Sequence, residues 1–428
     1  MEVTINAVND VEREMEINVS VEELQPHFDE AYKKAVPNLE IKGFRKGKVP
    51  LPMVKKMFGA SIEYQTVEDL TNDLFRKETE ERKINPIGTP SIIKLDFKPG
   101  EPLSFKVKYE VKPEFELKDI SGIEVEKFVH AATDEEVNNE IERLQQINAT
   151  FEEAQKVEGE DFVVTADIVD FDEQGNLLEK SKRENMRITL REKTTEKEIK
   201  EALQGVSVGD VKDVKFEHQH GDHSHKIHLQ ITVKKIERLI LPAMDDELAK
   251  KVSNGKFQTV AEMRDNIKKD LADFWLDRSN KRFENDLLEA IVKQYEFTVP
   301  TSVVNNLLDT YVEEVKNQQP GKTLPKNFNE KQYRESYKNI AEWQGKWLLI
   351  KEAMSEKENI TITDDDIASV AEKEAAKLGI DKERLISYYK SSEQATERIK
   401  YDRLIDILKR SVKIKETETD DYSKFSVQ

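Results

Sequence analysis

The chain has 428 residues, of which 37% are hydrophobic and 36% are charged, and its formal net charge is -18. This length predicts two to four domains, and the low apolar content favours several small cores in an extended shape over one compact core. The negative charge excludes general nucleic-acid binding, and the lack of cysteine excludes disulfides and thiol catalysis.

The first residues, Met-Glu-Val-Thr-Ile-Asn, lack the basic and apolar regions of a secretory signal. No apolar run approaches the roughly 18–20 residues that a membrane helix needs. The sequence therefore predicts a cytoplasmic protein without a membrane segment, and the lack of cysteine fits a reducing compartment.

Residues 1–112 predict an α+β domain. Apolar residues alternate with polar ones over residues 1–19, which indicates two strands joined by a turn at Asn9-Asp10. Ser20 and Glu23 form a capping-box pattern, so a helix is expected from Val21 to about Ala35. One helix opened by Pro50 and Pro52, a longer one beginning at Ser61, and strands near 92–97 and 103–111 complete the domain.

The stretch from Ile41 to Lys56 inside this domain carries six basic residues and no acid. Gly43 and Gly47 bracket Phe44, Arg45 and Lys46, which predicts a tight loop that presents a phenylalanine between two cations. One interpretation is a solvated turn. The other is a docking loop for an anionic partner, with Phe44 as an apolar or stacking anchor.

The run Gly43 to Pro50, Gly-Phe-Arg-Lys-Gly-Lys-Val-Pro, resembles the signature loop of the trigger factor family, bacterial chaperones that bind the ribosome where nascent chains emerge. Residues 83–90, 109–117 and 241–249 are also similar to the family and follow its order. The resemblance implies that the loop contacts a large-subunit protein beside the exit tunnel and nearby ribosomal RNA. The contact residues it implies are Gly43, Phe44, Arg45, Lys46, Gly47 and Lys48.

Residues 113–150 predict a linker with a strand and a helix that starts at the Thr133-Asp134-Glu135-Glu136 pattern. Residues 151–240 then predict a β-rich domain with a strand at 161–171 and a short helix over Lys197–Leu203. This order of elements is similar to the FKBP-type peptidyl-prolyl isomerase domain that trigger factors carry.

The residues of the proline pocket that this resemblance implies are largely replaced. Glu196, Lys197, Glu198 and Ile199 stand where the family has Ile-Pro-Gly-aromatic, and either Ala166 or Ile168 replaces a strand aromatic. The run Gly175-Asn176-Leu177-Leu178 replaces Gly-x-x-Phe. A degenerate pocket with weak or absent isomerase activity is therefore expected, and no catalytic residue is assigned.

Five histidines fall within eleven residues, from His218 to His228. His220, His223 and His225 are candidate ligands for Zn²⁺ or Ni²⁺, because neutral imidazoles at such spacing bind these ions. The alternative is a solvated hairpin with incidental metal affinity, and no metal or other cofactor is expected to be required.

Residues 241–414 predict an all-α domain, which the resemblance identifies as the chaperone body with two helical arms. Its long helices have too few apolar residues to bury every face, which favours exposed apolar surfaces for unfolded chains. The candidate client-binding residues are Met263, Phe274, Tyr311, Tyr337 and Trp343. The polar residues 415–428 predict a disordered tail.

The sequence as a whole predicts an α+β multidomain protein with an N-terminal ribosome-binding domain, an FKBP-like β-rich domain and an elongated helical C-terminal domain. The expected function is ATP-independent binding of nascent and unfolded polypeptides at the ribosomal exit tunnel, because no nucleotide-binding motif occurs. An active prolyl isomerase and an envelope chaperone of the helical-arm type are the alternatives. The resemblance leaves open a homodimer of the free protein.

Overall fold

The structure is a computed structural model that describes all residues except 41–43, 45–46, 173, 193, 221–222 and 427–428. The chain divides into two compact units. The first comprises Met1–Lys127 and Lys281–Glu416, and the second comprises Phe128–Asn280 and Thr417–Ser426. Within the described part of the chain, no helix combines the length and apolarity needed to cross a membrane.

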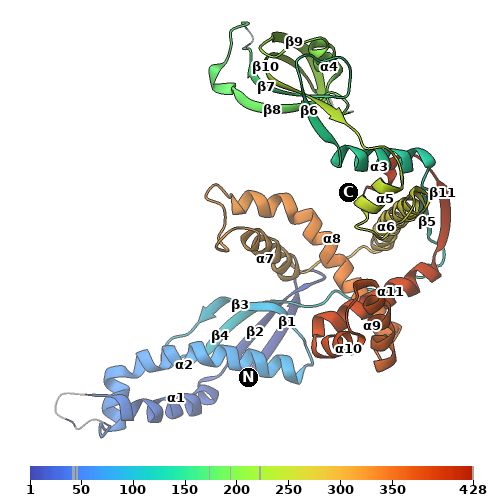
Figure 1. Ribbon diagram of the computed structural model, residues 1–428. Helices are drawn as coiled ribbons and strands as arrows, with labels where there is room; N and C mark the ends of the chain where they lie inside the picture. Colours follow the sequence, from blue (N-terminus) through green and yellow to red (C-terminus); the bar gives the residue numbers. More distant parts are fainter. Residues whose placement is uncertain (41–43, 45–46, 173, 193, 221–222, 427–428) are drawn as a thin grey trace. The chain divides into compact units, whose positions relative to one another are not determined.

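The N-terminal domain of the first unit is a four-stranded antiparallel sheet with two helices on one face (Figure 1). The strand order is β1-β2-β4-β3. Its elements are β1 (Glu2–Ala7), β2 (Glu12–Val19), α1 (Val21–Ala35), η1 (Val36–Asn38), α2 (Leu51–Glu81), β3 (Ile87–Asp96) and β4 (Leu103–Glu110).

Alternation along the strands separates the two faces of this sheet. Met15 and Ile17 of β2 lie opposite Val107 and Phe105 of β4, and all four side chains are buried against the helices. The other face carries ion pairs between strands, such as Lys108 with Glu12 at 2.6 Å. Strands β2 and β4 are therefore half-buried, with alternate side chains in the core, whereas β1 is mostly exposed, including Ile5.

Helix α1 begins where the capping-box pattern places it. Ser20 accepts the Glu23 N–H, and the Glu23 side chain accepts the Ser20 N–H. The two helices expected after Pro50 and after Ser61 are instead one continuous helix, α2, of 31 residues. That prediction was wrong because Gly59 and Ser61 continue the helix, and the absent side chain of Gly59 admits the Tyr32 hydroxyl of α1.

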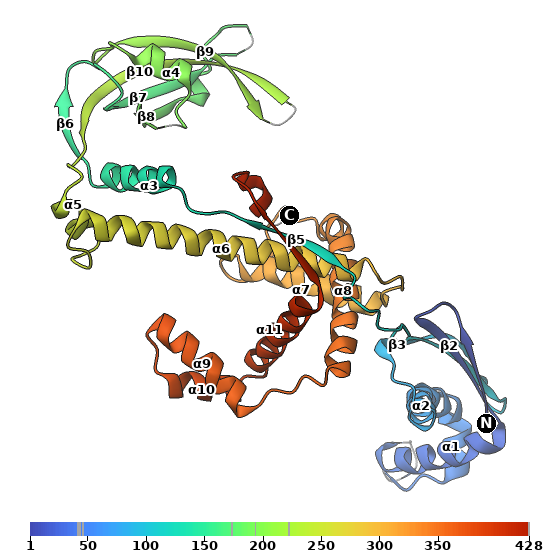
Figure 2. The ribbon, with the colours of Figure 1, turned by 90° about the vertical axis from the view of Figure 1, so that its right-hand side faces the viewer.

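Helices dominate the rest of the first unit. They are the C-terminal part of α6 (Val260–Val292), α7 (Thr301–Asn317), α8 (Glu330–Lys357), α9 (Asp364–Leu378), α10 (Lys382–Ser391) and α11 (Glu393–Ser411). Ile120 and Val125 from the linker join buried residues of α6, α8 and α11 in one apolar core. Helices α9, α10 and α11 group around a smaller core that includes Ile367 and Tyr389 (Figure 2).

The second unit contains the β-rich domain, a five-stranded antiparallel sheet with one short helix. Strands run in the order β6-β10-β7-β8, and β9 pairs with β10. The elements are β6 (Thr150–Ala154), β7 (Phe162–Asp170), η2 (Glu179–Ser181), β8 (Arg183–Thr189), α4 (Lys197–Leu203), β9 (Val211–His220) and β10 (His223–Ile240). Val164, Leu190 and Ile231 are among the fully buried residues that form its core.

Three helical segments belong to the second unit, and a two-stranded ribbon is divided between the two units. The helical segments are α3 (Asp134–Ile147), α5 (Asp246–Val252) and the N-terminal part of α6, which share an apolar core. The ribbon pairs β5 (Glu124–Val129) with β11 (Lys413–Glu418), and η3 (Tyr422–Phe425) follows β11.

The prediction of a disordered tail was therefore wrong. Residues 415–428 are polar, but Lys413 and Thr419 donate backbone hydrogen bonds to Ile123 and Val129 across the ribbon. A strand partner distant in sequence thus supplies the order that the local composition does not predict.

Candidate functional site

The basic loop lies at the end of the α1–α2 hairpin. Its base is closed, because the Gly47 N–H donates to the Leu39 carbonyl at 3.5 Å. Gly47 has a φ of +74°, a left-handed backbone conformation that favours glycine. Val49 is buried in the domain core, and Pro50 stands at the N-cap position of α2. The loop is therefore anchored on both sides by rigid helices.

Phe44 lies on this loop with 38% of its surface exposed. Large aromatic side chains are usually buried, so this exposure fits a contact residue. Lys48 is also exposed, whereas Gly43, Arg45 and Lys46 lie outside the described residues. Lys55, one turn into α2, pairs with Asp29 at 2.9 Å, and this hydrogen bond lowers the pKa of the Asp29 carboxyl.

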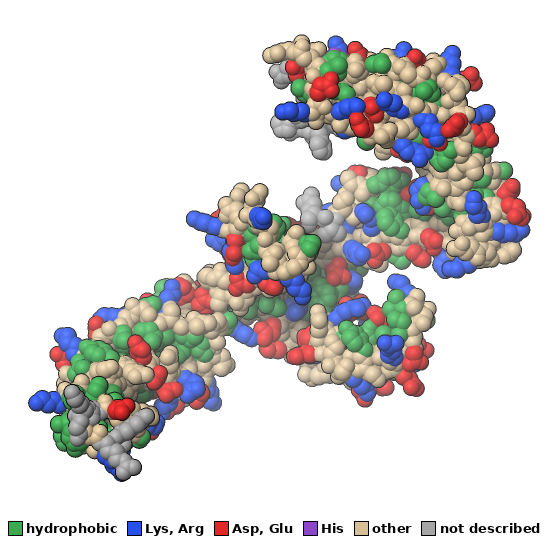
Figure 3. Space-filling view, turned by 60° about the vertical axis from the view of Figure 1, so that its left-hand side comes forward, with side chains coloured by type: hydrophobic (Ala, Val, Ile, Leu, Met, Phe, Trp, Pro, Cys, Tyr) green, Lys and Arg blue, Asp and Glu red, His purple; other side chains and the backbone are tan. Residues whose placement is uncertain are grey.

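Three exposed apolar residues on the first two turns of α2 adjoin the loop in sequence. They were not predicted as contact residues from the sequence. They are Leu51, Met53 and Met57. With Phe44 they form what we call the tip patch. Hydrophobic side chains gather at this end of the domain in Figure 3. Met53 and Met57 lie four residues apart and therefore share a helix face, which is not the face that buries Val54. This spacing is the sequence signal that could have identified them.

A row of aromatic side chains lies on the α7–α8 pair. Tyr337 contacts Tyr333 with 4.5 Å between ring centroids and Tyr311 with 5.9 Å, and Tyr333 contacts Phe328. Tyr311 donates its hydroxyl to the Gln344 side chain at 2.6 Å, and burial raises the pKa of the Tyr311 phenol. This row offers amphipathic contact area of the kind that binds varied apolar segments.

The five candidate client-binding residues fall into three groups. Met263 is 1% exposed in the core of α3, α5 and α6, so its assignment to a client-facing surface was wrong. Tyr311 and Trp343 are half-buried, and Trp343 packs against the core of the first unit. Phe274 and Tyr337 are exposed. Helical spacing alone marks both core and surface stripes, which is why Met263 was included.

The residues that replace the family's proline-pocket residues lie partly in the core and partly on the surface of the β-rich domain. Ala166 and Ile168 are buried on β7, and Ile199 packs against the domain core. Lys197 and Glu198 are exposed at the start of α4. Leu177 and Leu178 are also exposed, so no aromatic wall arises from the positions that the resemblance marks.

The candidate metal ligands sit on the β9–β10 hairpin. His220 lies opposite His223, and His218 opposite His225, in the strand register. The side chains of His220, His223 and His225 lie outside the described residues. Among the residues whose side chains are described, no group of three His, Asp or Glu is arranged to hold a metal ion.

Two family models match the chain. One, described as bacterial trigger factor protein, matches residues 1–144, and one described as the C-terminus of the same protein matches residues 259–410. These two segments contain the basic loop and the α7–α11 helices.

Two curated relatives span nearly the whole chain. A trigger factor of Chlorobaculum parvum is 33% identical over 427 residues, covering 98% of each chain. A trigger factor of Chlorobaculum tepidum is 32% identical and covers 98% of this chain and 99% of that one. A solved structure from work on promiscuous substrate recognition by the trigger factor chaperone covers 96% of this chain with a TM-score of 0.50 and 23% identity. That likeness supports the multidomain fold.

Proposed function

The chain belongs to the trigger factor family, and from that premise we propose that its basic loop and tip patch dock it on the ribosome. Members of the family are ribosome-associated chaperones, so the function of the chain is to assist the folding of newly made polypeptides. The observation that carries the proposed docking site is Phe44, exposed on a loop whose base is fixed by Gly47 and Val49.

The contact we propose has two chemical parts. Phe44, Met53 and Met57 supply apolar area for a protein surface beside the exit tunnel. Lys48, with Arg45 and Lys46, supplies positive charge for acidic side chains or ribosomal RNA phosphates. The local positive charge stands out in a chain of net charge -18, which directs the phosphate contact to this end of the domain.

Co-sedimentation with ribosomes tests this site. Replacing Phe44, Arg45 and Lys46 together by alanine is expected to abolish binding, because it removes the apolar anchor and two cations of the motif. Phe44 is exposed, so thermal stability is expected to stay unchanged. Binding by the unchanged chain is expected to weaken as salt rises, since phosphate contacts release counterions.

A matched variant loses two positive charges elsewhere in the same domain. Lys94 and Lys98 are exposed and pair with nearby acids, Asp96 and Glu101. Their replacement by alanine is expected to leave ribosome binding intact. Equal loss of binding in both variants would show that overall charge, rather than the loop, governs docking.

We further propose that unfolded clients contact the aromatic row of α7 and α8, centred on Tyr337, and the exposed Phe274 of α6. Side chains of mixed polar and apolar character bind many sequences weakly, which suits a chaperone of varied clients. Promiscuous recognition is also what the solved relative is described as performing.

Prolyl isomerisation is the second candidate activity, favoured by the FKBP-like order of elements at residues 151–240. We propose that this domain acts as a scaffold with weak or absent activity. Isomerases of this type enclose proline in a dry aromatic pocket, whereas Lys197 and Glu198 stand exposed at the corresponding helix start.

We also propose a cytoplasmic location and, for the free protein, a homodimer that covers the tip patch.

A further inference from the structure

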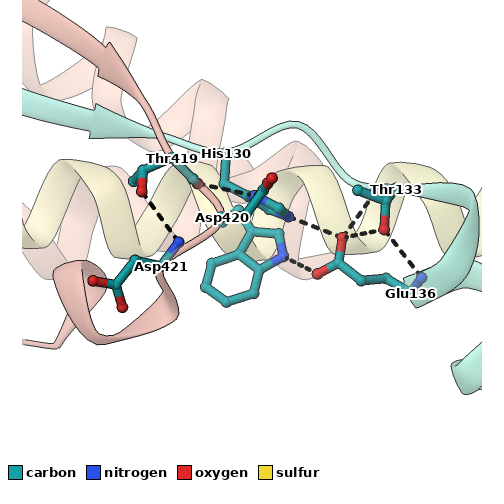
Figure 4. Close-up of polar contacts among 7 residues, drawn as sticks. His130, Thr133, Glu136, Thr419, Asp420 and Asp421 are labelled. Atoms are coloured by element: carbon teal, nitrogen blue, oxygen red, sulfur yellow. Dashed lines mark hydrogen bonds and ion pairs between the residues drawn. The ribbon is translucent and has the colours of Figure 1, made fainter.

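A buried histidine joins three elements of the second unit. His130 follows β5 directly, and its side chain is 1% exposed. It contacts Glu136 on α3, Trp275 on α6, and the segment Thr417–Ser426, which we call the C-terminal strap (Figure 4). This histidine is not among those of the hairpin.

Both ring nitrogens of His130 face hydrogen-bond acceptors. Nε2 lies 2.9 Å from a carboxylate oxygen of Glu136, and Nδ1 lies 3.2 Å from the carbonyl of Thr419 and 3.1 Å from a carboxylate oxygen of Asp420. A carbonyl cannot donate, so Nδ1 must carry a hydrogen. If Glu136 is ionised, Nε2 must carry one too, and the ring is an imidazolium.

Glu136 is held ionised by other donors. It accepts the backbone N–H of Thr133 at 2.8 Å as part of the α3 capping box, and the indole N–H of Trp275 at 2.9 Å. Burial acts to raise the pKa of Glu136, but the hydrogen bonds from Thr133, His130 and Trp275 outweigh it and lower that pKa. The carboxylate is therefore a fixed acceptor on α3.

The strap is also held by aromatic contacts. Tyr422 stacks on Trp275 with 4.9 Å between ring centroids, and Phe425 meets Trp275 edge to face at 5.2 Å. Phe425 is 1% exposed. The rings of Tyr422 and Phe425 also stand edge to face with His130.

We propose that His130 is the pin of a pH-dependent latch. As an imidazolium it holds the C-terminal strap against α3 and α6, and its deprotonation releases the strap and uncovers the aromatic surface of Trp275. The uncovered surface adjoins the exposed Phe274, so release enlarges an apolar surface on α6.

Deprotonation acts on the strap rather than on α3 because the two ring nitrogens face unequal acceptors. A neutral imidazole keeps one N–H. Glu136 is the stronger acceptor for it because its carboxylate is 14% exposed, whereas the Asp420 carboxylate is 86% exposed and is screened by water. Nδ1 then presents a lone pair to the Thr419 carbonyl and the Asp420 carboxylate, and this contact becomes repulsive. His130 thus keeps its hydrogen bond to Glu136 on α3 and loses its hydrogen bonds to the strap.

The direction of the pH response follows from the pKa of His130. Burial acts to lower this pKa, but the hydrogen bond and charge of Glu136, the Thr419 carbonyl and Asp420 outweigh it, so the pKa is raised above its ordinary value of 6.5. A raised pKa in the closed state means that the latch is fully closed below pH 6.5 and opens as the pH rises through the raised value.

The other charged side chains near His130 are four carboxylates and one lysine. They are Glu135 and Glu136 on α3, and Asp420, Asp421 and Lys424 on the strap. Burial raises the pKa of the Tyr422 phenol, so it stays neutral, and Trp275 on α6 does not titrate. His130 is therefore the group among them that changes charge near neutral pH.

Fluorescence quenching can follow the strap, because the chain has no cysteine and accepts a single label. We would place a bimane on Ser426→Cys, next to the buried Phe425, and record its quenching by Trp275 from about pH 6 to pH 9. The expected result is a rise of fluorescence with a midpoint above 6.5. The same labelled chain with Trp275→Phe corrects for quenching by other groups.

Two matched substitutions test the role of His130 without disturbing the core. Asp420 is 86% exposed, and Asp420→Asn is expected to lower the midpoint by roughly half a pH unit, as expected for loss of an exposed ion pair. Asp421→Asn removes the same charge one residue away and keeps a side-chain acceptor for the Ser423 N–H, so its midpoint should not move.

His130→Gln is expected to leave the strap released at every pH in this range. Fluorescence that is constant with pH in the otherwise unchanged chain would overturn the proposal. So would a pH response that persists in His130→Gln, or equal shifts in the two aspartate variants.

Discussion

Gly345 sets how closely α8 approaches α7. It is buried inside α8, and a Cβ placed on it would lie 2.8 Å from Cγ1 of Val299 and 3.3 Å from Cγ1 of Val303. Helix interiors disfavour glycine by about 1 kcal/mol relative to alanine, so the residue must be retained for packing rather than for helix formation.

Gly345→Ala is therefore expected to have two opposing effects on the free energy of unfolding. The gain in helix propensity is about 1 kcal/mol, and overpacking against the stiff Val299 side chain costs about 1–3 kcal/mol. We expect a net loss of about 1 kcal/mol in the free energy of unfolding, measured by denaturant titration. In a Val299→Ala background, where the closest methyl is gone, the same substitution should be neutral or stabilising. A stabilising effect in both backgrounds would contradict this account.

At the scale of elements, the start of α7 is capped by a residue from a different domain. Pro300 stands at the N-cap position and supplies no side-chain cap. Glu110, the last residue of β4, instead accepts the Thr301 N–H at 3.0 Å and the Ser302 N–H at 2.8 Å. Gly88 lies against Ser302, where a Cβ would clash at 2.4 Å. One carboxylate thus satisfies free N–H groups of the helix and complements its dipole.

Glu110→Ala is expected to remove about 1–2 kcal/mol of stabilisation from this helix start, as the loss of a capping side chain does. Hydrogen exchange at the amides of Thr301 and Ser302 should speed up by a corresponding factor. Glu110→Gln keeps an acceptor oxygen and loses the charge, so it should have a smaller effect. Equal exchange in all three proteins would mean that Glu110 does not cap α7.

The sequence predicted those elements whose signals are local. The capping box at Ser20 and Glu23 begins α1, and the limits of α4, Lys197–Leu203, are those expected. Strands β6 and β8 were not predicted, and β11 was taken for disorder. β6 and β11 gain their order from partner strands far along the chain, β10 and β5, whereas β8 pairs with β7, the strand before it.

The candidate site was predictable to a similar extent. The motif around Phe44 marked an exposed loop, and Phe44 is exposed. Met263 was misassigned because its helical stripe looks the same whether it meets solvent or α3. The strap contact of His130 joins residues 289 positions apart, a separation for which a single sequence carries no signal.

At the scale of the whole molecule, stability is divided among separate cores. The N-terminal domain, the β-rich domain and the helical body each bury their own apolar residues. A chain built this way is expected to unfold in more than one transition rather than as a single cooperative step.

Matched core substitutions test this division. Leu203→Ala and Leu24→Ala each remove a fully buried leucine, one from the β-rich domain and one from the N-terminal domain. Each should cost about 2–5 kcal/mol. In calorimetry each is expected to lower a different transition and leave the other in place. A common shift of all transitions would show that the domains unfold together.

The N-terminal core can form during synthesis, before the rest of the chain has been made. That core is built wholly from residues within the first 111, whereas the core of the body needs α11, and the ribbon needs β11 from the end of the chain. Roughly 300 residues separate the N-terminal domain from β11, and their synthesis takes about 15–60 s at typical elongation rates. For that interval the growing chain has a folded N-terminal domain while its helical body is unfinished. If the proposed docking site is right, a newly made copy is expected to engage ribosomes before it can hold clients of its own.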